Sequence, residues 1–174
     1  MLLLWYQSSS FLSRFIRFIT RSPYSHVAIQ VNSILYEALG RGITAHTSDQ
    51  NYDGRMEDAV AYQLVNIEEK YRKEVVRFLT NQIGHRYSFS GFIFAGLASL
   101  TGYRLVVAVG GEYICSGLVA TALLIAGEDI EEPRTETPAS LAMRYKPITL
   151  VNATEVDPRT IQSAAQHRLT LIKD

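Results

Sequence analysis

The sequence predicts an α+β domain in which an antiparallel sheet packs against a buried helix. Three short segments rich in apolar and β-branched residues follow one another at 25–31, 34–40 and 42–48. The pairs Asn-Ser and Gly-Arg-Gly lie between them as turn signals, and this pattern is typical of an antiparallel meander. Much later, the run 115–126 is almost wholly apolar and has no charged face, which predicts a helix buried on all sides.

The N-terminal region predicts one strand and one helix before the meander. Residues 1–6 are too apolar for an exposed start and indicate a buried strand. Apolar residues then recur at helical spacing over 11–19, where Ser9 or Ser10 can cap the helix. Three arginines fall on the solvent side of this helix, namely Arg14, Arg17 and Arg21. Pro23 ends the helical segment.

After the meander, residues 59–67 predict a further strand. We expect Asn66 to cap a helix over 68–84 that ends at Gly84. The acidic, proline-containing stretch 127–140 indicates a solvated surface loop.

The C-terminal part adds small elements to the same domain. A short helix is expected over 138–145 and an edge strand over 146–152. We therefore expect a single domain over 1–151, followed by a C-terminal tail of uncertain order over 152–174.

Composition restricts the classes of function. The chain has 174 residues, 47% of them hydrophobic, with 17 basic and 17 acidic residues, so no global field favours nucleic acid or an anionic membrane. A single cysteine cannot form an internal disulfide, and a Cys-rich zinc site is excluded. The four histidines are scattered without metal-ligand spacing, and no phosphate-binding glycine loop is present. We expect neither a metal nor another cofactor.

The apolar segments do not have the pattern of a targeting signal or a membrane span. The apolar start is only six residues long and has no basic residues before it, unlike a signal peptide. The longest apolar segment, 92–109, is interrupted by Thr101, Gly102 and Arg104, so it indicates buried core or an apolar surface. We expect a cytoplasmic protein without a transmembrane span. Contact with a membrane surface and the oligomeric state stay open.

The only cysteine, Cys115, stands at the predicted start of the apolar helix and directly follows a segment containing Gly110 and Gly111. A helix N-terminus favours the thiolate through its free N–H groups and dipole, and the backbone N–H of Cys115 could help to hold an oxyanion. The alternative interpretation is a buried structural cysteine, because this residue type is often buried.

A nucleophilic cysteine needs an imidazole and a group that orients it. His26 opens the first strand of the meander, although a structural histidine is the alternative there. Glu37 is the one carboxylate in a predicted interior strand, where a charge is costly unless it is paired. If Asn-Ser is a tight turn, the two strands are antiparallel neighbours, and His26 and Glu37 can meet across the ladder.

These features resemble the circularly permuted branch of the NlpC-like, papain-fold cysteine hydrolases, which includes the YiiX/YebB-like proteins of bacteria and phages. The likeness is carried by "YSHVAIQVNSILYEALGRGI", then "RYSFSGF", then "EYICSGLVATAL". In that branch the histidine strand comes first, a Glu-bearing strand follows, and the Cys-Ser helix start closes the core.

The resemblance implies a papain-like core and a Cys-His-Glu triad. Cys115 would be the nucleophile, His26 the general base and acid, and Glu37 the orienting group. Tyr87 and Ser116 match substrate-binding positions, although Tyr87 could equally pack against the core and Ser116 could bond a helix-start N–H.

The implied function is a cysteine hydrolase or acyltransferase that cleaves an amide or ester bond through a thioester. A peptide such as a cell-wall stem and a lipid acyl group are both candidate substrates. The alternative is an inactive structural or interaction module that keeps the fold.

Overall fold

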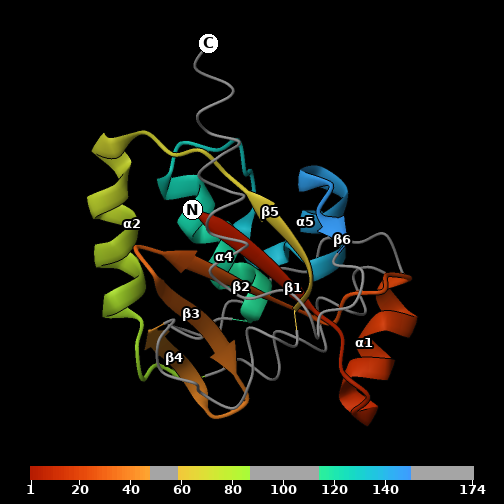
Figure 1. Cartoon of the computed structure of the whole chain (residues 1–174). Coiled ribbons are helices and arrows are strands. Elements are labelled where there is room, and N and C mark those ends of the chain that lie inside the picture. Colours follow the sequence, from red (N-terminus) through yellow and green to blue (C-terminus); the bar gives the residue numbers. More distant parts are fainter. Residues whose placement is uncertain (48–58, 87–113, 150–174) are drawn as a thin grey trace.

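The computed structural model describes residues 1–47, 59–86 and 114–149, in which an antiparallel six-stranded sheet carries helices (Figure 1). This confirms the α+β class. The strand order is β4-β3-β2-β1-β5-β6, so β1 and β2 lie at the centre. The strands are β1 Leu2–Tyr6, β2 His26–Val31, β3 Ile34–Leu39, β4 Gly42–Thr47, β5 Ala59–Leu64 and β6 Ile148–Thr149.

One helix forms the centre of the core. Helix α4 (Cys115–Ile125) packs against β2 and β3, and it also contacts α2 (Glu69–Asn81), η1 (Pro133–Thr135) and α5 (Pro138–Tyr145). Nearly all of α4 is buried, as its uncharged sequence predicts. Figure 1 shows α2 and α1 (Phe11–Thr20) at opposite sides of the molecule.

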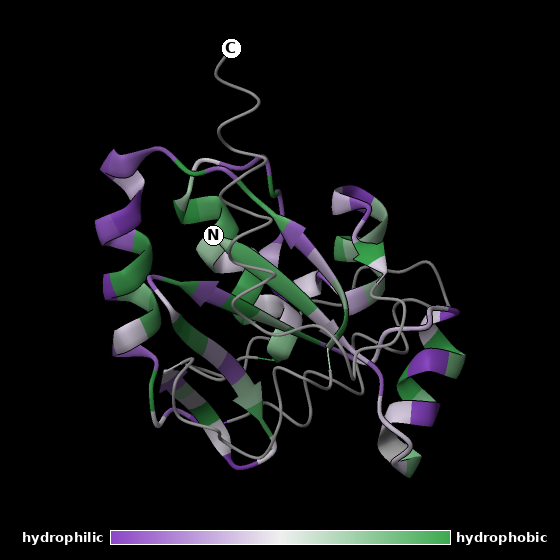
Figure 2. Ribbon diagram, in the orientation of Figure 1, coloured by the Kyte–Doolittle hydropathy of each residue, from purple (hydrophilic) through white to green (hydrophobic). Residues whose placement is uncertain are grey.

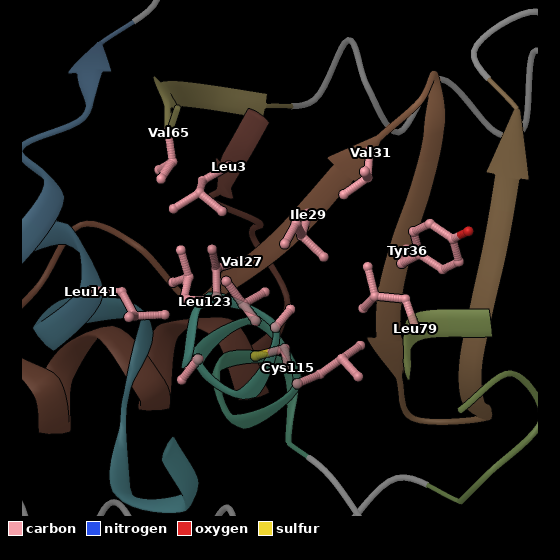
Figure 3. Packing of buried hydrophobic residues seen from close by; sticks show 14 of the residues in the cluster. Leu3, Val27, Ile29, Val31, Tyr36, Val65, Leu79, Cys115, Leu123 and Leu141 are labelled. Carbon is pink, nitrogen blue, oxygen red and sulfur yellow. The ribbon is translucent and has the colours of Figure 1, made fainter. Parts of the chain in front are cut away.

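The period-two alternation of the strands divides the apolar side chains between the two faces of the sheet. Val27 and Ile29 belong to the large cluster that contains α4, and Figure 3 shows both side chains directed at that helix. Ala28 and Leu35 belong to a second, smaller cluster. Figure 2 shows that the central strands and α4 are mostly hydrophobic, whereas α2 is hydrophilic along much of its length.

The hairpin between β2 and β3 is a two-residue turn, as predicted. Its residues Asn32 and Ser33 have φ angles of 51° and 63°, both in the left-handed region. Val31 pairs directly with Ile34, so the turn fixes the register of the two strands that carry His26 and Glu37.

Replacing Ser33 with glycine should stabilise the protein by about 1 kcal/mol, because a left-handed φ costs a residue with Cβ about that much more than glycine. Urea unfolding would measure the change. Ser9→Gly is the matched control: Ser9 is exposed and is not among the residues with positive φ, so that substitution should give no gain. A Ser33→Gly protein less stable than the wild type would contradict this account of the turn.

The predicted cap of α2 is wrong. The helix begins at Glu69 with Glu68 as its N-cap, and Asn66 lies before it, outside any helix or strand. Val65 and Ile67, on either side of Asn66, are both buried in the main cluster. Tertiary packing therefore overrides the local capping preference.

The end of α2 also differs from the prediction. The helix ends at Asn81, before Gly84, and the Gly84 N–H donates to the carbonyl of Ile43 on β4. Gly84 has a φ of 83°, so it forms a turn that returns the chain to the sheet. The remaining predicted elements are present in α1, α5 and the edge strand β6, which pairs with β5. Tyr87, the apolar segment 92–109 and the predicted tail 152–174 lie outside the described residues.

Candidate active site

His26 and Glu37 meet across two neighbouring strands. His26 is the first residue of β2 and Glu37 lies in β3, on the same sheet face as Leu35. The imidazole Nε2 is 3.2 Å from Glu37 Oε2, within hydrogen-bonding distance. The Glu37 side chain is fully buried, whereas that of His26 is 15% exposed. The predicted contact between His26 and Glu37 is therefore present, beyond the last paired residues of the two strands.

Cys115 lies beside His26 at the point where α4 begins. Besides burial, the thiol and the imidazole each shift the pKa of the other by charge and hydrogen bonding, and the backbone N–H groups of Val27 and Ser116 help to lower the pKa of the thiol. Because Nε2 of His26 is occupied by Glu37, the other ring nitrogen, Nδ1, is the one that can serve the sulfur. Cys115 is 4% exposed.

The Cys115 sulfur lies near the point where the pairing of β2 with β3 ends. The pairing of β2 with β3 runs from Val31–Ile34 to Ile29–Tyr36 and stops there. The next inward-facing residue of β2, Val27, lies beyond this register, and its N–H is one of the groups that lower the pKa of the Cys115 thiol. The start of α4 therefore fits where the two strands separate, which brings a thiol on one side of the sheet to an imidazole on the other.

The three side chains shift one another's protonation. Burial alone would lower the pKa of His26, but the charge and hydrogen bond of Cys115, together with those of Glu37, outweigh it and raise the pKa to about 9. Burial raises the pKa of Cys115, yet the adjacent imidazolium and the two backbone N–H groups outweigh it and leave the pKa below its usual value. This electrostatic balance favours the thiolate–imidazolium form of the pair.

The helix start adds further donors. The first N–H bonded within α4 is that of Leu118, to the carbonyl of Ile114, so the N–H groups of residues 115–117 make no intrahelical bond. Ile114 is the N-cap residue and provides no side-chain cap. The Ser116 N–H acts on the sulfur itself, so the N–H groups of Cys115 and Gly117 are the candidates to hold the oxyanion formed when a thiolate attacks a carbonyl.

His46 is a neighbour of the site that the sequence reasoning did not include. Its Nε2 is 3.9 Å from Glu37 Oε1 and 3.0 Å from the hydroxyl of Thr44. Thr44 stands opposite Glu37 in the register of β3 with β4, so alternation places His46 on the same face. The signal was available in the sequence, because counting outward from the Gly-Arg-Gly turn puts Glu37 opposite Thr44, two residues before His46.

The contacts of Ser116 are to the protein itself. Its side chain is fully buried and its hydroxyl donates to the backbone carbonyl of Glu136 at 2.6 Å. This bond attaches the loop after η1 to the start of α4, and the substrate contact of Ser116 stays a prediction. Tyr87, the other predicted substrate-binding residue, lies outside the described residues.

Within residues 1–47, 59–86 and 114–149, no group of three or more His, Cys, Asp and Glu side chains could hold a metal ion. None of the helices in this part of the chain has the length and apolarity needed to cross a membrane. The chain matches no protein-family model and shows no significant similarity to a curated protein. A function must therefore be inferred from the geometry of Cys115, His26 and Glu37.

Proposed function

We propose that this protein is a cysteine hydrolase or acyltransferase with a permuted papain-like core and a Cys115-His26-Glu37 triad. The observation that supports the proposal best is that one imidazole, His26, is 3.2 Å from a fully buried carboxylate and interacts electrostatically with the Cys115 thiol. A structural cysteine has no need of such a partner, whereas a nucleophilic thiolate needs an imidazole and a group that orients it.

In the first step, the Cys115 thiolate attacks the carbonyl carbon of an amide or ester. A carbon–sulfur bond forms, and the carbonyl electron pair moves to the oxygen, where N–H groups at the start of α4 stabilise it. The tetrahedral intermediate then collapses. The bond to the leaving nitrogen or oxygen breaks, and the His26 imidazolium donates its proton to the leaving group.

In the second step, water attacks the thioester while neutral His26 accepts its proton. The carbon–sulfur bond breaks, the acid leaves, and the thiolate–imidazolium pair is restored. A different acceptor, an alcohol or an amine, would make the same site an acyltransferase. Glu37 stays ionised throughout and holds the imidazole with Nε2–H toward the carboxylate.

We expect acyl probes to leave an acyl group on Cys115. The purified protein would be mixed with p-nitrophenyl esters and p-nitroanilides that carry peptide-like or fatty acyl groups, and intact-protein mass spectrometry would detect the thioester. Cys115→Ser is the matched control, since it removes the only thiol of the chain with a minimal change in volume. If no probe acylates the wild type and Cys115 is as inert as a buried structural thiol, the alternative of an inactive module is correct.

A further inference from the structure

The outer surface of α1 is apolar and exposed, although an amphipathic helix ordinarily buries its apolar side. Phe11 is 86% exposed, Phe18 is 80% exposed and Phe15 is 44% exposed. Their spacing of four and three residues aligns them along one side of the helix. We call these three residues the phenylalanine stripe.

Arginines flank the phenylalanine stripe along one side. At 100° per residue, Arg14 lies next to Phe18 around the helix, and Arg21 is the C-cap residue directly after α1; both arginines are exposed. Arg17 lies one step further round, and its guanidinium donates to the carbonyl of Ser8 at 3.4 Å. None of the ten residues of α1 is acidic. The chain as a whole has a formal net charge of zero, so this positive charge is a local property of α1.

The opposite side of α1 is fixed to the rest of the protein. Ile16 and Ser13 are buried, and the Ser13 hydroxyl is 2.7 Å from the hydroxyl of Ser25. Ser10 caps the helix by accepting a hydrogen bond from the Ser13 N–H. Because Ser25 directly precedes His26, these contacts hold α1 at the end of β2 that carries the candidate active site. Figures 1 and 2 show α1 at the outer edge of the molecule, with hydrophobic and hydrophilic residues both on its surface.

We infer that α1 docks onto an anionic membrane surface, with the phenylalanine stripe inserted at the boundary between headgroups and acyl chains. A short helix with large apolar residues on one side and arginines beside them is suited to lying in the interface plane. The arginines complement the negative headgroups, and the buried contacts of Ser13 and Ile16 hold the helix in position before it binds. The inference does not depend on the proposed chemistry at Cys115.

Vesicle co-sedimentation of the full chain would test the inference. We expect the protein to bind vesicles of mixed phosphatidylcholine and phosphatidylglycerol about tenfold more tightly than vesicles of phosphatidylcholine alone, and added salt should weaken the binding. The double variant Phe11→Ser/Phe18→Ser should lose at least about tenfold in partitioning to the mixed vesicles. Arg14→Gln/Arg21→Gln should lose about fivefold per arginine and most of the preference for anionic lipid.

Two matched controls remove similar groups elsewhere on the surface. Met143→Ser removes a largely exposed apolar side chain from α5, and Lys73→Gln/Arg77→Gln removes two exposed cations from α2. Both variants should bind the mixed vesicles as the wild type does. Cys115→Ser should also bind normally, so a failure of the proposed chemistry and a failure of membrane docking give different results.

Three outcomes would overturn the inference. The first is a wild type that does not bind the anionic vesicles. The second is binding that the phenylalanine double variant, still folded by circular dichroism, leaves unchanged. The third is a dimer in sedimentation velocity that the same variant converts to a monomer, which would assign the phenylalanine stripe to a second copy of the chain.

Discussion

Replacing His26 with alanine should slow the alkylation of Cys115 at pH 7 by about 100-fold or more. In the wild type, the imidazolium and two backbone N–H groups hold the pKa of Cys115 below its usual value despite burial. Without the imidazolium, burial acts against only the two N–H donors, so the pKa of the thiol rises and little thiolate remains at neutral pH. Iodoacetamide, a small reagent suited to a thiol that is only 4% exposed, would measure the rate.

The pH dependence separates this electrostatic effect from a change in access. The wild-type alkylation rate should reach its plateau at a lower pH than that of the variant, because the thiolate forms as the pH rises through a lowered pKa. The alkylation rate of the variant should instead rise steadily with pH. The ratio of the wild-type rate to the variant rate should therefore fall at alkaline pH. A ratio of the two alkylation rates that stays constant at every pH would indicate altered access of the reagent and would contradict the proposed ion pair.

A second, less destabilising variant should accompany His26→Ala. His26 supplies a hydrogen bond to a fully buried carboxylate, and breaking a buried ionic pair costs about 3–5 kcal/mol. His26→Asn keeps a side-chain N–H near Glu37 but cannot accept the thiol proton at neutral pH, so it should show the slow alkylation in a more stable protein. Cys115→Ser is the labelling control, since the chain has no other cysteine.

The turnover of an acyl substrate should follow a bell-shaped pH profile. The rising limb reports formation of the Cys115 thiolate, and the falling limb, at about pH 9, reports loss of the His26 proton that the leaving group requires. Alkylation needs no leaving-group proton, so its rate should lack this fall. The two profiles together therefore distinguish the nucleophile from the acid.

Local patterns were sufficient to predict most of the sheet and one of the two contacts of His26. The Asn-Ser turn fixes the register of β2 with β3, and alternation then brings His26 and Glu37 to one face. Both inferences use residues within about a dozen positions of each other. The apolar run of α4 likewise predicted a helix that is buried nearly all round.

The contact between Cys115 and His26 could not be derived in the same way. It joins the start of α4 to the start of β2, and it depends on where the β2–β3 ladder ends, a property of tertiary packing. The order of motifs in a resembling family suggested the contact, but no local propensity did. The displaced start of α2 has a similar origin, because burial of Val65 and Ile67 decides it and the capping preference of Asn66 does not.

Glu37→Ala should cost about 10- to 100-fold in acyl transfer, the value of a hydrogen bond to a charged group. The carboxylate raises the pKa of His26 through both a hydrogen bond and its charge, so the variant should also show a lower His26 pKa in an NMR titration. Glu37→Gln keeps an acceptor for Nε2–H and should retain activity within about tenfold of the wild type, although its His26 pKa should fall as well. Activity that is lost in Glu37→Ala but largely kept in Glu37→Gln, with a lower His26 pKa in both, is what we expect of an orienting carboxylate.

His46→Gln is the matched control for Glu37, because it changes the other imidazole near the same carboxylate. Its Nε2 is 3.9 Å from Glu37 Oε1, beyond hydrogen-bonding distance, so we expect a loss of less than about fivefold. If His46→Gln costs more than Glu37→Ala, the carboxylate serves His46 and the triad is assigned wrongly. If Glu37→Ala stays folded and leaves both the rate and the His26 titration unchanged, the buried carboxylate has no part in holding the imidazole, and its place between two histidines needs another explanation.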